Sequence, residues 1–136
     1  KARILLDLSH SGQRTVAEGI AAATRPPAIT HSGCRALVDF PRNTHDAEMR
    51  ALAEKGGVFG IYLMPFLRSK GQPGTQDLIR HLDHAVNVCG EDHVGIGTDG
   101  PVTQIDDLEA YRVRLAEYQL LPRIFSDYVG RALVPA

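Results

Sequence analysis

Along this chain, short continuous runs of apolar residues alternate four times with stretches in which apolar residues recur at helical spacing. Short apolar runs span residues 4–8, 28–31, 58–64 and 94–98, and each precedes a stretch in which apolar side chains recur at three- and four-residue steps. The short runs predict buried strands, and the longer steps predict amphipathic helices. Because strands that alternate with helices pair in parallel, the sequence predicts an α/β fold of four consecutive parallel strand-helix units.

Residues with known helix-capping preferences set the expected helix boundaries. The first helix runs from about residue 13 to 24. Asn43 or Thr44 is expected to cap the second helix and Thr75 the third. A glycine follows the C-terminal end of each of these two helices. A last helix is expected to carry Asp106 and Asp107 in its first turn, where acidic side chains favour the helix dipole.

Two architectures satisfy this order of elements. One is an open, doubly wound sheet, and the other is half of an eight-stranded (β/α)8 barrel of the TIM type. The turn after the first strand holds the lone glycine Gly12 and no Gly-x-Gly-x-x-Gly pattern, which disfavours a nucleotide-binding sheet. At 136 residues the chain is long enough for one domain and too short for two, so residues 1–136 are expected to form a single domain.

Charge and hydropathy exclude several classes of partner. The 15 basic and 16 acidic residues leave a net charge of -1, so neither nucleic acid nor an anionic membrane surface is an expected partner. The apolar runs are too short to span a membrane. Cys34 and Cys89 form no metal or redox motif, and reduced thiols in a cytoplasmic protein are the expectation.

Three residues with metal-binding or proton-transfer chemistry follow predicted strands. They are His10, His31 and Asp99. The carboxyl ends of parallel strands lie on one face of the sheet, so we expect the three side chains to converge there. Along the last strand, Gly95 and Gly97 would leave room beside the carboxylate.

Two neutral imidazoles and a carboxylate suit a zinc ion. The carboxylate of Asp99 could ligate the metal or accept a proton from water. Arg42, in the loop after the second predicted strand, could pair with a substrate carboxylate through two parallel hydrogen bonds. Taken singly, each histidine could equally be a hydrogen-bonded structural residue, and Arg42 a solvated one.

The remaining histidines are not expected to bind metal. His81 and Asp83 form the only His-x-Asp pair, but on a helix two side chains at this spacing point about 200° apart. His81 and His84 are expected on the surface of a crossover helix. His93 precedes its strand, at the opposite rim of the sheet, and His45 is expected to be solvated.

The combination of these motifs resembles the C-terminal half of the renal, or membrane, dipeptidase family. The matching segments, in the order of the family, are Asp7-Leu8-Ser9-His10, Thr30-His31-Ser32, Pro41-Arg42-Asn43, His81-Leu82-Asp83-His84 and Gly95-Ile96-Gly97-Thr98-Asp99-Gly100.

The resemblance implies that residues 1–136 are a single incomplete domain, which holds strands five to eight of a zinc-dependent (β/α)8 hydrolase barrel. By position, His10 and His31 resemble the two histidines of the second of two zinc ions, and Asp99 resembles the catalytic acid/base. Arg42 resembles the arginine that holds the terminal carboxylate of a dipeptide. In this family a metal-activated hydroxide attacks the peptide carbonyl while the aspartate carries the proton to the departing amine.

The family's His-x-Asp strand and its bridging glutamate belong to the N-terminal half, and this chain has neither. We therefore expect at most a partial zinc site and no activity of the chain alone. The expected partners are a dipeptide substrate and either the missing half or a second copy in a homodimer, because unpaired strand edges need cover. Two alternatives stay open: a non-catalytic half-barrel that serves as an assembly module, and a related metal-dependent amide or ester hydrolase.

Overall fold

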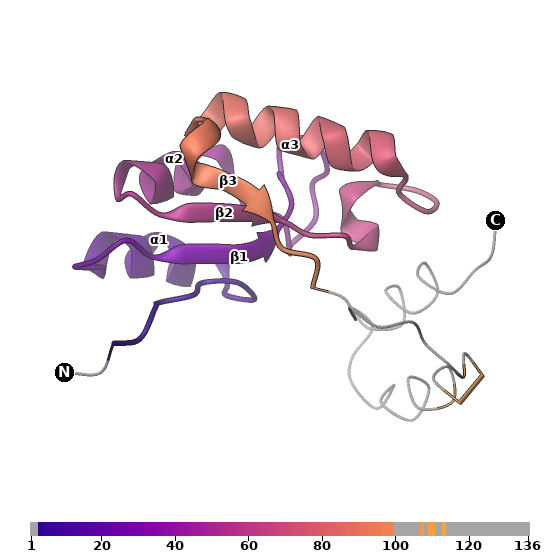
Figure 1. Cartoon of the computed structure of the whole chain (residues 1–136), viewed down its shortest axis with the longest axis horizontal. Helices are drawn as coiled ribbons and strands as arrows, with labels where there is room; N and C mark the ends of the chain where they lie inside the picture. Colours follow the sequence, from indigo (N-terminus) through magenta and orange to yellow (C-terminus); the bar gives the residue numbers. More distant parts are fainter. Residues whose placement is uncertain (1–2, 100–106, 108, 111–112, 114–136) are drawn as a thin grey trace.

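The fold rests on a parallel sheet of three strands. The computed structural model describes residues 3–99, 107, 109–110 and 113, so most of the predicted last helix lies outside the described residues. The strands are β1 (Ala28–Ser32), β2 (Val58–Ile61) and β3 (Val94–Ile96), and they pair in the order β1-β2-β3 (Figure 1). The predicted α/β class is therefore confirmed, and the sequential order, without a reversal, is that of a barrel segment rather than a doubly wound sheet.

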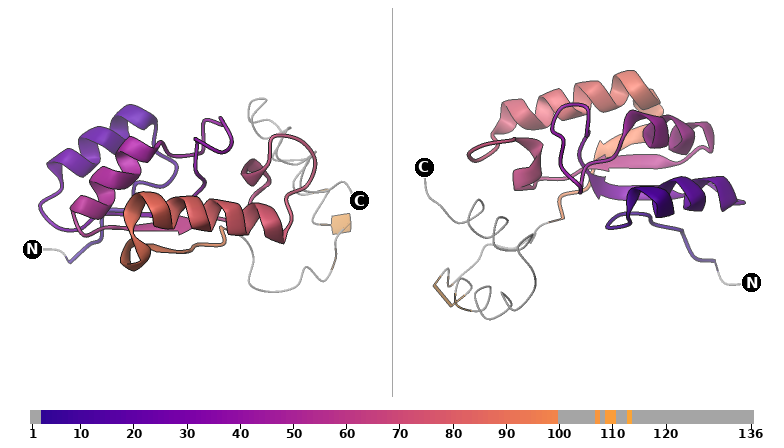
Figure 2. Two further views of the ribbon diagram at one scale, coloured as in Figure 1. Left: turned by 90° about the horizontal axis from the view of Figure 1, so that it is seen from above. Right: turned by 180° about the vertical axis from the view of Figure 1, so that it is seen from behind.

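The three main helices pack on one face of this sheet (Figure 2). They are α1 (Gln13–Ala22), α2 (Asp46–Glu54) and α3 (Thr75–Cys89), with short 3-10 turns at Pro65–Leu67 and Glu91–His93. None of the helices in the described part of the chain is long and apolar enough to cross a membrane. One core joins helices and sheet, and its buried members include Val16, Ile20, Ile29, Met49, Leu52, Phe59, Ile61, Ala85 and Cys89.

The first predicted strand is only partly formed, which corrects the expectation of a buried strand at residues 4–8. Asp7 forms a single parallel bridge with Ala28, and the backbone of Leu8 donates to the Ala28 carbonyl at 2.8 Å. Ile4 and Leu5 are 81% and 61% exposed. Their exposure follows from position, because β1 covers this segment on one side only and no described residue covers the other.

Two of the predicted helix caps were one residue or more from the observed ones. The N-cap of α2 is His45 rather than Asn43 or Thr44, and its backbone N–H donates to the Glu48 carboxylate at 3.1 Å. The N-cap of α3 is Gly74. Asp77 accepts the Gly74 N–H at 2.9 Å, so an acidic side chain at the third helical position satisfies the exposed donor.

His81 is fully buried, which corrects the expectation that it lies on the surface. Its Nδ1 accepts the backbone N–H of Cys34 at 3.0 Å, and its Nε2 lies 3.1 Å from the carbonyl oxygen of Leu67. Because a carbonyl only accepts, Nε2 carries the proton and the ring is neutral. His81 therefore joins two loops to α3, and burial lowers its pKa.

β1 is irregular at its carboxyl end, and glycines accommodate the irregularity. The pairing register with β2 shifts between Ile29 and Ser32. A Cβ atom placed on Gly60 or on Gly97 would overlap the backbone carbonyl of Thr30. The sheet can therefore close around Thr30 only because both positions lack a side chain.

We predict that Gly60→Ala destabilises the fold by about 1–3 kcal/mol, because the added methyl group forces the backbone of Thr30 to shift. The matched variant is Gly95→Ala, on the neighbouring strand, where an added Cβ meets no atom within 4 Å. It should leave stability unchanged or raise it by at most about 1 kcal/mol. Urea unfolding of the two variants measures the difference, and equal losses would contradict the close approach to Thr30.

A second prediction concerns the pH dependence of stability. The folded state holds His81 neutral, so between its lowered pKa and the ordinary value of 6.5 the unfolded chain binds more protons than the folded one. The free energy of unfolding must then fall as the pH drops below about 6.5, by at most about 1.4 kcal/mol per pH unit. In His81→Gln the amide can accept from Cys34 and donate to Leu67 without titrating. Denaturant unfolding of this variant should show a shallower slope below pH 6.5 than the wild type, and an unchanged slope would contradict the assignment.

Candidate functional site

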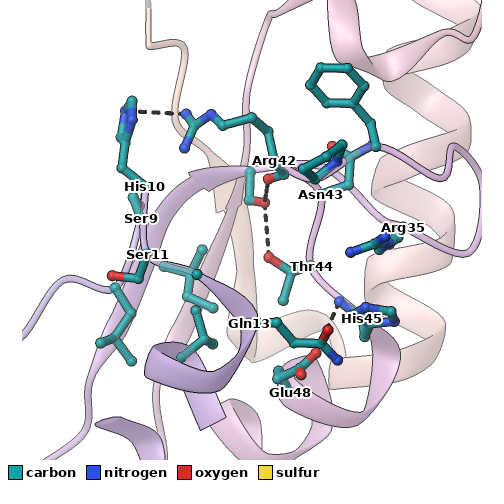
Figure 3. A pocket seen from close by; sticks show the side chains of 17 residues that line it. Ser9, His10, Ser11, Gln13, Arg35, Arg42, Asn43, Thr44, His45 and Glu48 are labelled. Carbon is teal, nitrogen blue, oxygen red and sulfur yellow. Dashed lines mark hydrogen bonds between the residues drawn. The ribbon is translucent and has the colours of Figure 1, made fainter. Parts of the chain in front are cut away.

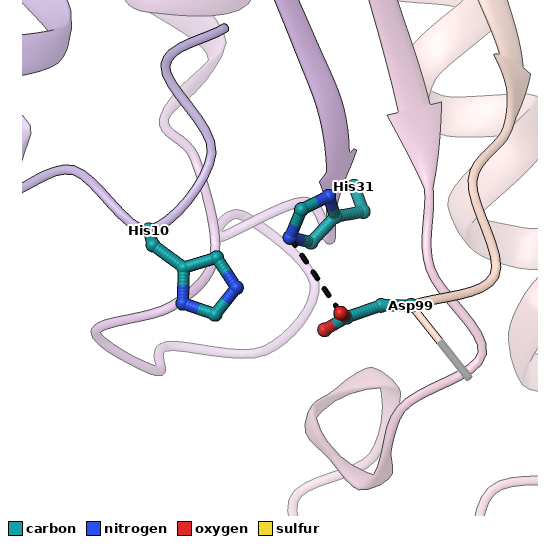
Figure 4. Close-up of side chains that lie close together, drawn as sticks. All are labelled: His10, His31 and Asp99. Atoms are coloured by element: carbon teal, nitrogen blue, oxygen red, sulfur yellow. Dashed lines mark ion pairs between the residues drawn. The ribbon is translucent and has the colours of Figure 1, made fainter. Parts of the chain in front are cut away.

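The side chains of His10, His31 and Asp99 meet at the carboxyl ends of the strands (Figure 4). Each offers one ligand atom, and these atoms all lie within 4.8 Å of one another. The two imidazole rings make an edge contact, with centroids 4.9 Å apart. Residues separated by up to 89 positions are thus brought into one cluster by the parallel topology.

Two members of the cluster have a left-handed backbone. The φ angles of His10 and Asp99 are 62° and 53°, and they are the non-glycine residues with positive φ among those that the structure describes. This conformation costs a non-glycine residue about 1–3 kcal/mol and is found most often at functional sites. The side chains of both residues point toward His31 (Figure 4).

The imidazole of His31 has one satisfied and one unsatisfied nitrogen. Its Nδ1 lies 2.9 Å from the hydroxyl of Thr30. Its Nε2 is buried and has no hydrogen-bond partner among the described residues, and it lies 3.7 Å from the nearer carboxylate oxygen of Asp99. A buried nitrogen without a partner is costly, so this atom is suited to an additional ligand.

Asp7 ties the end of the first segment to the end of β1. Its carboxylate accepts the hydroxyl of Thr30 at 2.6 Å and the hydroxyl of Ser9 at 2.8 Å, together with the backbone N–H groups of both residues. Burial alone would raise the pKa of Asp7, but these hydrogen bonds outweigh it and lower the pKa to about 2. Asp7 is therefore a carboxylate at neutral pH, and it links the chain segments that carry His10 and His31.

Arg42 lies between His10 and Asp99. One of its terminal nitrogens is 3.1 Å from Nε2 of His10 and 3.7 Å from Oδ2 of Asp99. Because a guanidinium only donates, Nε2 of His10 is the acceptor. Burial lowers the pKa of His10, and the charge of Arg42 lowers it further against the opposing effect of Asp99, which favours the neutral form of the ring that binds metals.

The loop that carries Arg42 is held by buried polar contacts. The hydroxyl of Ser32, at the end of β1, donates to the carbonyl of Arg42 at 2.8 Å. Next to it, the amide of Asn43 donates to the carbonyls of Val38 and Phe66 at 2.8 and 3.0 Å. The hydroxyl of Tyr62 donates to the carbonyl oxygen of the same amide. The buried side chain of Asn43 thus bonds three other residues and holds the loop that carries Arg42.

A pocket of about 360 Å³ opens beside the cluster (Figure 3). His10 and Arg42 lie on one of its walls, and it extends between the N-terminal ends of α1 and α2. Its lining combines polar groups with the apolar side chains of Leu8, Val16 and Ile29. A small polar molecule with an apolar part could bind here next to the cluster.

The donor set of the cluster fits a cation such as zinc. Two imidazole nitrogens and a carboxylate are ligands that zinc prefers, and Nε2 of His31 already faces the site without a partner. The guanidinium of Arg42 lies beside His10 and Asp99, so its positive charge is a neighbour of any cation bound there. His84 lies outside this cluster, and its Nε2 is 2.9 Å from a carboxylate oxygen of Asp46.

Sequence reasoning predicted that the three strand ends converge, but it missed the residues that support them. No role in the site was expected for Asp7, Ser9, Thr30 or Asn43, although each stands inside a motif together with a predicted site residue. The expectation that Gly97 leaves room beside Asp99 was wrong, because the backbone carbonyl of Thr30 occupies that space.

The chain is similar in sequence to proteins of the membrane dipeptidase family. The sequence pattern of the membrane dipeptidase family matches residues 1–127. A dipeptidase of Clonostachys rogersoniana, verJ, is 30% identical over 130 residues, which cover 92% of this chain and 33% of that protein. A Klebsiella pneumoniae protein encoded in the pqqA 5' region is 35% identical over 102 residues, covering 71% of this chain and 38% of that protein.

Among solved structures, a metallopeptidase from Rhodobacter sphaeroides superimposes with a TM-score of 0.68 and 26% identity, covering 94% of this chain and 42% of that one. That protein was crystallised with a phosphinate mimic of the dipeptide L-Ala-D-Ala. The chain therefore spans only about a third of the length of the curated relatives that it matches.

Proposed function

Because this chain belongs to the membrane dipeptidase family, we propose that it is the part of a zinc-dependent dipeptidase that contributes His10, His31, Asp99 and Arg42 to the active site. One observation supports this most directly: the ligand atoms of His10, His31 and Asp99 lie within 4.8 Å of one another. The bare, buried Nε2 of His31 points to the same role.

His10 and His31 would hold the zinc ion. Bound zinc would supply Lewis acidity toward the peptide carbonyl. The lone pair on Nε2 of His10 now accepts from Arg42, so Arg42 and a metal compete for this atom. With a metal on His10, the guanidinium of Arg42 would be available to an anion.

That anion is the terminal carboxylate of the dipeptide. A guanidinium can donate two parallel hydrogen bonds to a carboxylate, and Arg42 lies on the wall of the adjoining pocket. The Rhodobacter relative, which was crystallised with a dipeptide mimic, supports a substrate of this class. Arg42 would orient the substrate rather than take part in proton transfer.

Asp99 would move the proton. It is partly buried, and its carboxylate lies 3.7 Å from both Nε2 of His31 and the guanidinium of Arg42. From there it can accept a proton from the attacking water and deliver it to the departing amine. Its left-handed backbone holds the carboxylate toward the imidazoles.

The proposed site is a partial one. Zinc in a hydrolase has three or more protein ligands. In the cluster of the described residues only His10 and His31 are left to bind it, because Asp99 would move the proton. The sheet face away from the helices leaves Val58 46% exposed, which an eight-stranded barrel would bury. We therefore propose that the chain alone has little or no activity and that further barrel strands complete the site.

The exposed apolar residues also favour a second candidate function. Ile4 and Leu5 lie at one edge of the sheet, Ile96 lies at the other, and all three are more than half exposed. Apolar edges of this kind promote association, so the half-barrel could act as an assembly module and form a homodimer. Sedimentation of the purified chain as a stable monomer would contradict this candidate.

We predict that the chain binds zinc through His10 and His31. Replacing His31 by Gln should weaken zinc binding by at least about tenfold, and His10→Gln should have a similar effect. The matched control is His93→Gln, because Nδ1 of His93 bonds the Gly57 carbonyl at the opposite end of the sheet. Competition with a chromophoric chelator measures the affinities, and equal binding by all variants would contradict the ligand assignment.

A further prediction concerns hydrolysis. The 136-residue chain with saturating zinc should cleave dipeptides far more slowly than a complete enzyme of the family, since a partial site stabilises the transition state poorly. A panel of dipeptides, other amides and esters would test the substrate class at the same time. Full dipeptidase activity with two bound zinc ions per chain would contradict the incomplete site, and cleavage confined to other amides or esters would favour the related hydrolase instead.

A further inference from the structure

The hydrogen bonds of the Thr30 hydroxyl determine which ring nitrogen of His31 carries a proton. A carboxylate can only accept, so the short contact of 2.6 Å to Asp7 uses the single proton of the Thr30 hydroxyl. The oxygen of Thr30 is then left with lone pairs only. It can approach Nδ1 of His31 at 2.9 Å only as an acceptor, which requires a proton on Nδ1.

Ser9 completes the same arrangement. Its hydroxyl also lies 3.2 Å from that of Thr30, but the shorter contact, at 2.8 Å, is to the Asp7 carboxylate, which takes its proton. The Ser9 oxygen accepts the backbone N–H of His31 at 3.1 Å. Both the ring and the backbone of His31 are therefore anchored to hydroxyls that Asp7 orients. The other ring nitrogen, Nε2, has no hydrogen-bond partner among the described residues and lies 3.7 Å from Asp99.

We propose that Asp7 and Thr30 are positioning residues that hold His31 in the Nδ1–H tautomer, so that the bare Nε2 faces the cluster with His10 and Asp99. The inference rests on the proposed function for the use of that nitrogen as a metal ligand. The tautomer itself depends only on the hydrogen bonds. Partners of this kind commonly change metal affinity by about 10–100-fold when they are removed.

The chain offers variants that separate positioning from packing. Thr30→Ser keeps the hydroxyl, whereas Thr30→Val keeps the shape and removes it. In Asp7→Asn, Oδ1 must still accept the two backbone N–H groups at 3.0 and 3.2 Å, so the new NH2 group takes the position that faces the hydroxyl of Thr30. The proton of Thr30 is then free to go to Nδ1 of His31, and the ring shifts toward the Nε2–H form. Thr24→Val, at an exposed threonine beyond α1, is the control for the threonine substitution.

The direct readout is the nitrogen-15 spectrum of the histidine side chains in the metal-free full chain, at a pH where imidazoles are neutral. Wild type, Thr30→Ser and Thr24→Val should show His31 as the Nδ1–H tautomer. Thr30→Val and Asp7→Asn should shift it toward the Nε2–H form. A wild-type spectrum dominated by the Nε2–H form, or a spectrum unchanged in both Thr30→Val and Asp7→Asn, would overturn the inference.

Zinc titration of the same proteins provides the second readout. Thr30→Val should lose about 10–100-fold in zinc affinity, while Thr30→Ser and Thr24→Val stay close to wild type. If the wild-type chain shows the Nδ1–H tautomer and binds no zinc, the positioning role stands and the proposed function fails. If Thr30→Val shifts the tautomer but binds zinc as tightly as wild type, the role of Thr30 toward the metal is overturned.

Discussion

The site depends on the hydrogen bonds that the carboxylate of Asp7 accepts. It accepts hydrogen bonds from the backbones and hydroxyls of both Ser9 and Thr30, and so joins the segment before His10 to the strand that ends at His31. The segment at residues 4–8 has only one bridge to the sheet. Backbone hydrogen bonds between this segment and Ala28, and the burial of Leu8, hold it beside β1. The carboxylate of Asp7 extends this link to the residues next to the two histidines.

A second set of constraints acts on His10, Asp99 and Arg42. His10 and Asp99 adopt a left-handed backbone, which costs free energy and persists only where the surroundings enforce it. Arg42 is held by the buried amide of Asn43 and by Ser32 at the end of β1. The site is thus built from local strain and buried polar contacts, supported by a conventional apolar core between helices and sheet.

The two faces of the sheet differ in how completely they are covered. The helices bury one face, while the other leaves Val58 and the residues around it open. In a closed barrel this face is a packed interior. The uncovered face of the sheet is where further barrel strands would complete the site. The same face leaves apolar surface that favours association, so both candidate functions follow from it.

The sequence by itself determined the alternation of strands and helices beyond residue 12, because each short apolar run is followed by apolar steps of three and four residues that only a helix places on one face. The parallel order then required His10, His31 and Asp99 to end at one face. What the sequence could not determine depends on neighbours distant along the chain. The burial of His81 depends on Cys34 and Leu67, and the exposure of Ile4 depends on the absence of a covering element among the described residues. The state of the His31 ring likewise depends on Asp7, a residue 24 positions away that only the tertiary structure brings into contact with Thr30.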